Sequence, residues 1–242
     1  MEKINKKGAS HIEIILSFVI FIGFIIFLFA VIKPFKSAER GEIYLEVVER
    51  GIINQTSTEI NSIPLKINYE FKQDENCFSF VFNGSLKNII AKDENSDIME
   101  AKSLWIDNGE KKEIIINSNK NFSYVYSSEE FNESIFDITK CKELNKEDYT
   151  IGLFRKEMMI SESKMNNFYK KYNESYDNSK KDVGLPSSKD FAFSIRDTSN
   201  NAILIANKKV PKGVNVWAKD IPIRIAYNNG TFVYAMLNVQ TW

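Results

Sequence analysis

The side chains that most enzymes use for proton transfer and nucleophilic attack are scarce in this 242-residue chain. Its single histidine, His11, lies near the N-terminus, beside a long apolar stretch. The rest of the chain therefore has no histidine to act as a base, to activate a serine or cysteine, or to bind a metal. It also has no glycine-rich phosphate loop and no nucleophile-elbow motif. We expect no enzyme and no cofactor; a carboxylate pair brought together by folding is the one catalytic arrangement left open.

Acidic residues gather at two places that could bind calcium weakly. Asp93, Glu94 and Asp97 form one group, and Glu129 and Glu130 form the other. Both groups lie in polar, turn-like stretches, and neither has the spacing of an EF-hand loop. Solvated loops are the favoured interpretation, so we expect no metal site.

Two cysteines, Cys77 and Cys141, can form a disulfide if this part of the chain lies outside the cell membrane. Such a bond would close a loop of roughly 65 residues and stabilise the fold by about 4 kcal/mol in the chain-entropy model. Two separate buried thiols are the alternative. The spacing fits no zinc motif.

Asn-x-Ser/Thr sequons, which accept N-linked glycans in exported proteins, occur along the whole chain. They begin at Asn54, Asn83, Asn121, Asn132, Asn173 and Asn229. Because the chain is rich in asparagine, several sequons are expected by chance. They therefore support a surface location only weakly.

An apolar run from Ile14 to Ile32 contains no charged residue, and Ser17 and Gly23 are its only breaks. As an α-helix it would span roughly 28 Å, close to the thickness of a bilayer's hydrocarbon core. A helix that is apolar on every side suits lipid better than a water-facing core. A secretory signal peptide has a shorter apolar region, followed by small residues at its cleavage site. We therefore predict a membrane helix that is not cleaved after the run.

The residues before this run form a short basic leader. Lys6 and Lys7 are followed by Gly8, Ala9 and Ser10, and the apolar run begins almost at once. This arrangement resembles the leader of archaeal type IV pilins, the class III signal peptide, which a prepilin peptidase cuts after a basic residue and a glycine or alanine. The match at Lys7, Gly8, Ala9 and Ser10 implies cleavage after Gly8, so that Ala9 begins the mature chain. As a motif the resemblance covers about the first 60 residues and does not identify the rest.

The resemblance also implies a role for Glu13 in subunit assembly. After the cut, Glu13 is the fifth residue of the mature chain, where many pilins carry a glutamate. In that family the carboxylate meets the N-terminal amine of a neighbouring subunit in the filament. A carboxylate at the centre of a bilayer helix costs about 2.5–3.5 kcal/mol on insertion scales, but at the edge it can reach the head groups. The alternative is an ordinary anchor whose first turn contains a glutamate.

Charge gives little information about partners or orientation. Lys and Arg number 32, as do Asp and Glu, so the formal net charge is zero. No block of like charge indicates a nucleic-acid partner. Basic residues lie on both sides of the apolar run, so the positive-inside rule does not fix its orientation. An extracellular C-terminal domain therefore depends on the pilin-type leader.

Residues 37–60 are predicted to form an amphipathic helix after Pro34, a residue that should end or kink the apolar helix. Glu46 and Arg50 are spaced for a favourable ion pair on its exposed side. One apolar stripe follows the helical repeat, at Leu45, Val48 and Ile52.

From Ile63 the apolar period changes to that of a half-buried strand. Turn-like clusters, including Asn83-Gly84-Ser85 and Asp107-Asn108-Gly109, separate further short segments, which favours an antiparallel sheet or small sandwich. Residues 137–148 are polar and are predicted to form a loop. The strand candidates are Leu65–Phe71, Cys77–Phe82, Asn88–Ala91, Ile98–Ile106, Glu113–Asn117, Phe122–Tyr126 and Tyr149–Ile160.

One further helix is predicted from about Glu162 to Lys181, with Ser161 or Ser163 capping its start. Gly184 then marks its end. An aromatic stripe on it is interpreted as a face packed on a sheet, in preference to a partner-binding face. The stripe consists of Met165, Phe168, Tyr169, Tyr172 and Tyr176.

The last quarter of the chain again favours strands and ends in a hairpin across Asn229-Gly230. A two-residue turn there predicts that Tyr227 pairs with Phe232, Ile225 with Tyr234 and Ile223 with Met236. The strand candidates are Phe191–Arg196, Ala202–Ala206, Val214–Ala218, Ile221–Tyr227 and Thr231–Val239.

The sequence as a whole predicts an α+β fold. A long membrane-embedded N-terminal helix extends into an amphipathic helix, which packs on a β-rich antiparallel globular domain with one further helix. The predicted parts are a leader (1–8), a transmembrane or filament-core helix (9–36), the amphipathic helix (37–60), a β-rich region (61–148) and an α+β region (149–242). The last two are expected to form one globular unit.

This organisation favours a structural subunit, major or minor, of an archaeal type IV pilus-like surface filament. The expected partners are prepilin peptidase, other pilin-like subunits through the N-terminal helix, and membrane lipid, with no nucleic acid. The chain would cross the cell membrane once, with its C-terminal domain outside. The alternative is a permanently anchored surface protein whose β-rich domain binds a ligand. Glu13 and the cut after Gly8 distinguish the two hypotheses.

Overall fold

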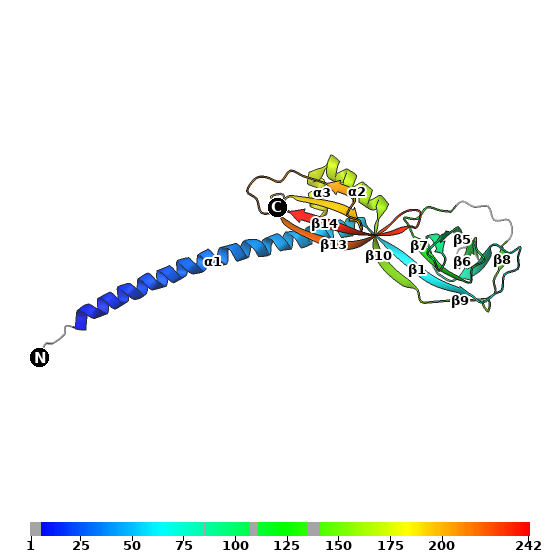
Figure 1. The fold of residues 1–242 in the computed structure, drawn as a ribbon, viewed down its shortest axis with the longest axis horizontal. Helices are drawn as coiled ribbons and strands as arrows, with labels where there is room; N and C mark the ends of the chain where they lie inside the picture. The colour runs from blue at the N-terminus through cyan, green and yellow to red at the C-terminus, as the bar shows by residue number, and fades with distance from the viewer. Residues whose placement is uncertain (1–5, 85, 107–110, 135–140) are drawn as a thin grey trace.

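A single helix, α1, forms the first fifth of the chain. The computed structural model describes residues 6–84, 86–106, 111–134 and 141–242. Helix α1 runs without interruption for 51 residues, from Lys6 to Thr56. Figure 1 shows it as a long, gently curved rod that projects from the β-rich part of the molecule. Of the two predicted effects of Pro34, an end or a kink, the structure excludes the first, because α1 continues past this residue. A proline removes one backbone hydrogen bond, and this helix has many turns on either side of the loss.

The second half of α1 packs on the β-rich part as predicted. Leu45, Val48 and Ile52 are 7%, 0% and 0% exposed, which confirms the apolar stripe. The exposed ion pair between Arg50 and Glu46 is also present, at 3.5 Å. The helix ends at Thr56, four residues before the predicted boundary, because β1 begins directly at Ser57.

Fourteen strands follow among the described residues, and they build two sheets. The larger, ten-stranded sheet has the order β12-β11-β14-β13-β10-β1-β7-β3-β4, with β9 also paired to β1, and the smaller has the order β5-β6-β2-β8. The strands of residues 57–151 are β1 (Ser57–Ile67), β2 (Phe78–Phe82), β3 (Asn88–Lys92), β4 (Ile98–Met99), β5 (Ala101–Ile106), β6 (Lys111–Ile116), β7 (Phe122–Ser128), β8 (Lys142–Glu143) and β9 (Tyr149–Ile151). The remaining strands are β10 (Arg155–Ser161), β11 (Phe191–Asp197), β12 (Ala202–Ala206), β13 (Trp217–Ala226) and β14 (Phe232–Thr241).

We call the half of the molecule next to α1 the proximal lobe. It contains β10–β14 and two helices, α2 (Glu162–Glu174) and α3 (Tyr176–Asp182).

The prediction of one helix in this lobe is wrong, because Ser175 has non-helical backbone angles (φ −148°, ψ 67°) and separates α2 from α3. Ser161 caps α2 as predicted, its hydroxyl oxygen accepting from the Lys164 backbone N–H. The aromatic stripe is core, since Met165, Phe168 and Tyr172 are buried. This lobe's core joins α1, α2 and the inner faces of β11, β13 and β14.

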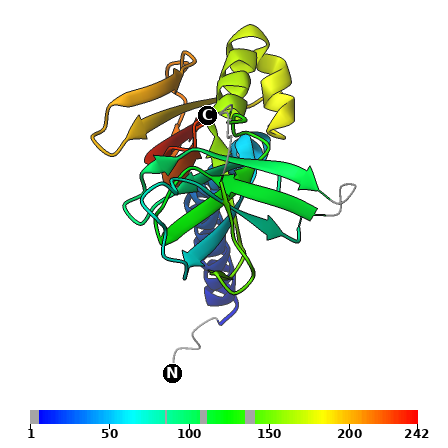
Figure 2. The same cartoon turned by 90° about the vertical axis from the view of Figure 1, so that its right-hand side faces the viewer.

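We call the other half, residues 62–151, the distal lobe. The four-stranded sheet packs here on the end of the large sheet, around a core that includes Leu65, Phe78 and Ile116. Figure 2 views the molecule from this end, with α1 receding behind the strands. Strand β1 belongs to both lobes, because it pairs with β10 over residues 57–62 and with β7 over residues 61–66. The large sheet therefore joins both lobes.

Several predicted strands have other boundaries in the structure. The first strand spans Ser57–Ile67, where the sequence predicted Leu65–Phe71, because its residues pair directly after α1. The predicted Ile98–Ile106 strand divides into β4 and β5, which belong to different sheets. Similarly, Tyr149–Ile160 divides into β9 and β10. Residues 142–143, predicted as loop, form the short β8 beside β2. The predicted turn at 107–109 lies outside the described residues.

The C-terminal hairpin is present, but its predicted register is wrong by one residue. The structure pairs Ala226 with Phe232, where the prediction paired Tyr227 with Phe232. The backbone N–H of Gly230 donates to the Tyr227 carbonyl, and the Tyr227 N–H donates to the Thr231 carbonyl, both at 2.9 Å. Gly230 has a positive φ of 85°. This is the hairpin in which a left-handed residue follows the turn and adds a bulge.

The shift moves side chains to the other face, because successive residues of a strand alternate. Ile225 pairs with Val233 rather than Tyr234, and Ile223 with Ala235 rather than Met236. Tyr234 consequently lies on the outer face with 64% of its surface exposed. The two predicted strands before the hairpin form the single strand β13, since β14 pairs along its whole length.

Candidate membrane and assembly helix

The N-terminal half of α1 is apolar and has no partner in the described structure. Residues Ile12–Val31 form a segment of 20 residues with a mean hydropathy of 3.2, none of it buried. At about 1.5 Å per residue it is about 30 Å long, which matches a bilayer core. Large side chains such as Ile12 and Ile20 are 69% and 64% exposed. An apolar surface of this length needs lipid or other protein to cover it.

Glu13 is the only ionisable residue in this apolar segment. Its side chain is exposed, at the end of the segment farthest from the β-rich lobes. The predicted cut-site residues, Lys7 to Ser10, lie in the first turns of α1, which begins at Lys6. Helix α1 therefore carries Lys6 and Lys7 in its first turn and, at the start of the apolar segment that follows, the Glu13 carboxylate.

The two halves of α1 have opposite surroundings. Beyond Gly41 the helix contacts β13, β14, β10 and α2. Gly41 and Gly51 mark the closest approaches, because an added Cβ would lie 2.1 Å from the Trp217 ring and 2.4 Å from the Val183 Cα. The absence of side chains at these glycines lets α1 lie directly on the proximal lobe. This packing fixes the direction in which the apolar half projects.

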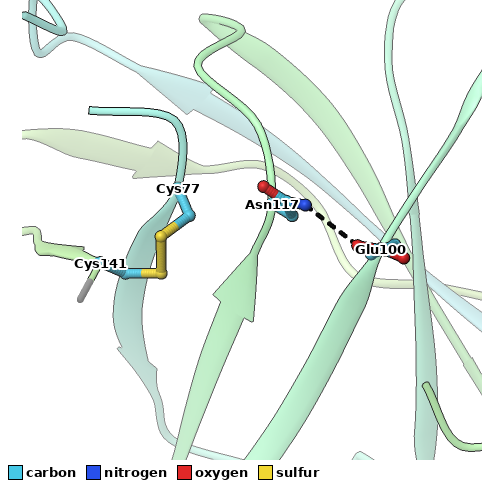
Figure 3. The surroundings of a disulfide bond; sticks show 4 residues. All are labelled: Cys77, Glu100, Asn117 and Cys141. Atoms are coloured by element: carbon cyan, nitrogen blue, oxygen red, sulfur yellow. Dashed lines mark hydrogen bonds between the residues drawn. A yellow bond between two sulfur atoms is a disulfide. The ribbon is translucent and has the colours of Figure 1, made fainter. Parts of the chain in front are cut away.

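Cys77 and Cys141 form a disulfide, with their Cα atoms 4.9 Å apart and a sequence separation of 64. Figure 3 shows the bond joining the chain before β2 to the chain before β8, near the hydrogen bond of 3.0 Å from Asn117 to Glu100. The Lys142 N–H also donates to the Cys77 carbonyl, at 3.0 Å. The bond therefore attaches a short edge strand, which has few ladder hydrogen bonds of its own, to the distal lobe.

All of the sequon asparagines are exposed in the structure. Two of the corresponding hydroxyl residues, Thr56 and Ser123, are 0% exposed. The sequons at Asn54 and Asn121 are thus only half accessible in the folded chain. The sequon at Asn229, at the turn of the C-terminal hairpin, is more accessible than these two, because Asn229 is exposed and Thr231 is partly exposed. Glycosylation of any of them stays a prediction.

The acidic clusters hold backbone and lysine groups. Asp93 is buried, and its Oδ1 accepts from the backbone N–H groups of Asn95 and Asp97, at 2.9 and 3.0 Å. Glu129 pairs with Lys87, and Glu130 with Lys164. No cluster of three or more His, Cys, Asp or Glu residues that could hold a metal ion occurs among the described residues.

Three lysines are buried among the described residues, Lys92, Lys112 and Lys180, and none was foreseen from the sequence. Lys92 and Lys112 are 7% and 6% exposed. Burial lowers the pKa of both side chains. These two form no ion pair with a carboxylate among the described residues, and their ammonium groups lie instead over aromatic rings, Lys92 at 4.1 Å from the centre of Phe232 and Lys112 at 4.3 Å from the centre of Trp105. Cation–π contacts with these rings therefore stabilise the buried ammonium groups, as a carboxylate partner would. These contacts join segments that are distant in the sequence or in neighbouring strands, so no local motif reveals them.

Comparison with known proteins does not place the chain in a protein family. No protein-family model, no curated protein and no solved structure matches the chain. The structure therefore defines the chain as an α+β protein. It has an exposed apolar helix near its N-terminus and a disulfide in its distal lobe.

Proposed function

We propose that this chain is a non-catalytic subunit of a type IV pilus-like surface filament. The observation that carries the proposal is the division of α1. Its first half is an exposed apolar rod with one carboxylate near its start, and its second half is packed on a β-rich domain. In this proposal the apolar half rests in the membrane and then packs with the same helix of other subunits. The lobes form the outer surface of the filament.

Two other observations support this proposal. The leader places a basic residue, Lys7, and Gly8 directly before the apolar segment, which is where a prepilin peptidase would cut. The disulfide fits a β-rich domain outside the cell, because disulfides persist in oxidising surroundings. The exposed carboxylate of Glu13 would pair with the amine of Ala9 in a neighbouring subunit, where surrounding apolar side chains would strengthen the attraction.

The first test is the N-terminus of the protein extracted from the membranes of its native host. We expect mass spectrometry to find a chain that begins at Ala9. Filaments sheared from the cell surface should contain the same processed chain. An intact chain that begins at Met1 or Glu2 would contradict the proposal. It would favour the second candidate, a permanently anchored surface protein.

The second test concerns assembly after processing. Glu13→Gln should still yield a chain that begins at Ala9 but should remove it from the sheared filament fraction, because the amide cannot form the ion pair. Ser17→Ala, one turn further along α1, is the matched control and should leave incorporation unchanged. Equal incorporation of the Glu13→Gln variant and the unmodified chain would sink the assembly role of the carboxylate.

A further inference from the structure

Three adjoining cavities lie along one flank of the molecule, with volumes of about 440, 560 and 240 Å³. Lys87 and Glu129 line both the first and the second. Asn88, Ser103 and Glu133 line both the second and the third. Neighbouring cavities therefore share wall residues, and the three together make up one row on the surface. We call this row the flank groove. The first two cavities are each in the size range of small-molecule sites.

An exposed aromatic residue lines each of the two larger cavities. Phe154, 45% exposed, lies in the first cavity, and Trp105, 56% exposed, lies in the second. Trp105 is the cross-strand partner of Lys112, whose Nζ lies 4.3 Å from the ring centre. The same Nζ donates to the Leu86 carbonyl. The indole is therefore held in place while more than half of the residue faces solvent.

The charges at the first cavity and its edge neutralise one another. Its lysines form ion pairs with carboxylates of adjoining strands and loops. Among the described residues, the first cavity therefore offers an anionic ligand no cluster of unpaired lysines, although its walls are polar. The pairs are Lys87–Glu129, Lys156–Glu59 and Lys164–Glu130.

Uncharged polar groups with unused hydrogen-bonding capacity also line the first cavity, although Ser127 and Ser128 are only 1% and 2% exposed. Asn61 lines the first cavity, and its buried Oδ1 has no hydrogen-bond partner among the described residues. Ser127 and Ser128 line the same cavity, and their hydroxyl oxygens accept from the backbone N–H groups of Lys87 and Glu130. Each hydroxyl keeps a hydrogen that it can donate. A ligand that both donates and accepts would satisfy these groups.

We propose that the flank groove binds a neutral oligosaccharide. Sugar rings present flat C–H faces that stack on aromatic rings, and hydroxyl groups that both donate and accept. Trp105 and Phe154 would stack on separate sugar rings, and Asn61 and the two serines would bind hydroxyls between them. An apolar peptide would leave these buried polar groups without partners, which is costly. This binding role goes beyond the filament proposal and does not depend on it.

The test uses the full chain in a detergent without a sugar head group, applied to an array of neutral and acidic oligosaccharides. We expect binding to a subset of neutral gluco-, manno-, galacto- or chito-oligosaccharides, followed by titration with the strongest ones. Trp105→Ala and Phe154→Ala should each weaken that binding about tenfold or more, as truncation of a central aromatic contact does. Trp105→Tyr should keep most of the affinity.

Leu153→Ala is the matched control. Leu153 is 79% exposed and adjoins Phe154 in the sequence, but it does not line any of the three cavities. This variant should bind as the unmodified chain does. Thermal unfolding of each variant separates loss of binding from loss of fold. The proposal is overturned if no arrayed oligosaccharide binds at millimolar concentration, if only acidic ones bind, or if folded Trp105→Ala and Phe154→Ala variants bind normally.

Discussion

Gly230 determines how the last two strands pair. Its φ is +85°, and an added Cβ would lie 2.4 Å from the Cδ1 of Ile90. The residue therefore meets two constraints, a left-handed backbone and close contact with the distal lobe. Gly213 meets only the first, because its φ is +78° and nothing lies within 4 Å of an added Cβ. The two glycines separate the cost of conformation from the cost of contact.

We expect Gly213→Ala to lower the free energy of unfolding by about 1 kcal/mol, the cost of a left-handed alanine. Gly230→Ala should lower it by about 2 kcal/mol or more, because the methyl group must also displace Ile90. Urea denaturation of the two variants measures the difference. Equal losses would show that the contact with Ile90 contributes nothing.

Asp190 gives the proximal lobe a dependence on pH. Its Oδ1 accepts from the ammonium groups of Lys180 and Lys208, each at 3.2 Å. Burial raises the pKa of Asp190, but hydrogen bonds from these lysines and Tyr176 outweigh it, so the pKa lies below the usual 3.8. Because the folded state favours the carboxylate, its contribution is present above the unfolded pKa and is lost as the pH falls through the folded pKa.

Asp190→Asn should therefore lower the free energy of unfolding by about 1 kcal/mol at neutral pH, since the carboxylate is partly screened by solvent. The difference between the variant and the unmodified chain should shrink below about pH 4, where the carboxylate becomes protonated. Denaturation curves recorded across this range make the comparison. A difference that stays constant down to acid pH would show that the loss is not electrostatic.

At the residue scale, periodicity predicted the buried faces of helices well. Leu45, Val48 and Ile52 follow a helical repeat and are buried. The contact of Asp190 with Lys208 was not predictable, because it joins two connecting segments that are 18 residues apart in the sequence and no local pattern encodes it. The hairpin register was missed for another reason. The sequence Asn229-Gly230 fits both a two-residue turn and the bulged loop, and only the fold selects between them.

At the scale of elements, helix α1 depends on Gly51 to lie close to the proximal lobe. Alanine at an exposed helix position is more stable than glycine by about 0.5–1 kcal/mol. At Gly51, however, the added Cβ would meet the backbone of Val183, with 2.4 Å to its Cα. Gly23, in the apolar half of the same helix, has nothing within 4 Å.

Gly51→Ala should therefore destabilise the folded domain by about 1–3 kcal/mol, because backbone atoms must move to admit the methyl group. Gly23→Ala is the control in the same helix and should leave thermal unfolding of the domain unchanged. Tryptophan fluorescence can follow the transition, since Trp217 packs beside α1 at Gly41. A Gly51→Ala variant as stable as the unmodified chain would contradict the close packing described here.

The elements differ in how well their sequences predict them. Strand β12 has the predicted bounds, Ala202–Ala206. Strand β8 has only two residues, Lys142–Glu143, and forms because it lies beside β2 next to the disulfide. Strand β1 begins well before its alternating pattern, since pairing with β10 extends it back to Ser57. Tertiary pairing, rather than local propensity, sets these boundaries.

At the scale of the whole molecule, strand pairing and side-chain packing hold the two lobes together in addition to the covalent connection between them. Strand β1 runs through both, and a small third core that includes Ile60 and Phe131 fills the space at their junction. Tyr126 of β7 contacts Phe232 of β14, with ring centres 5.0 Å apart. The flank groove therefore lies on a surface that is fixed relative to α1. A ligand bound there would be held at a set position from the apolar half of α1.

The same arrangement predicts that the apolar half of α1 contributes nothing to the stability of the lobes. Residues Ile12–Val31 are wholly unburied, whereas the contacts of α1 with the core begin near Gly41. A fragment of residues 37–242 should therefore be soluble and monomeric without detergent. Its thermal midpoint should agree with that of the full chain in detergent within about 2 °C, because a loss of 1 kcal/mol would already shift it by about that much. A fragment that aggregates, or that unfolds more than about 5 °C lower, would show that the apolar half also supports the fold.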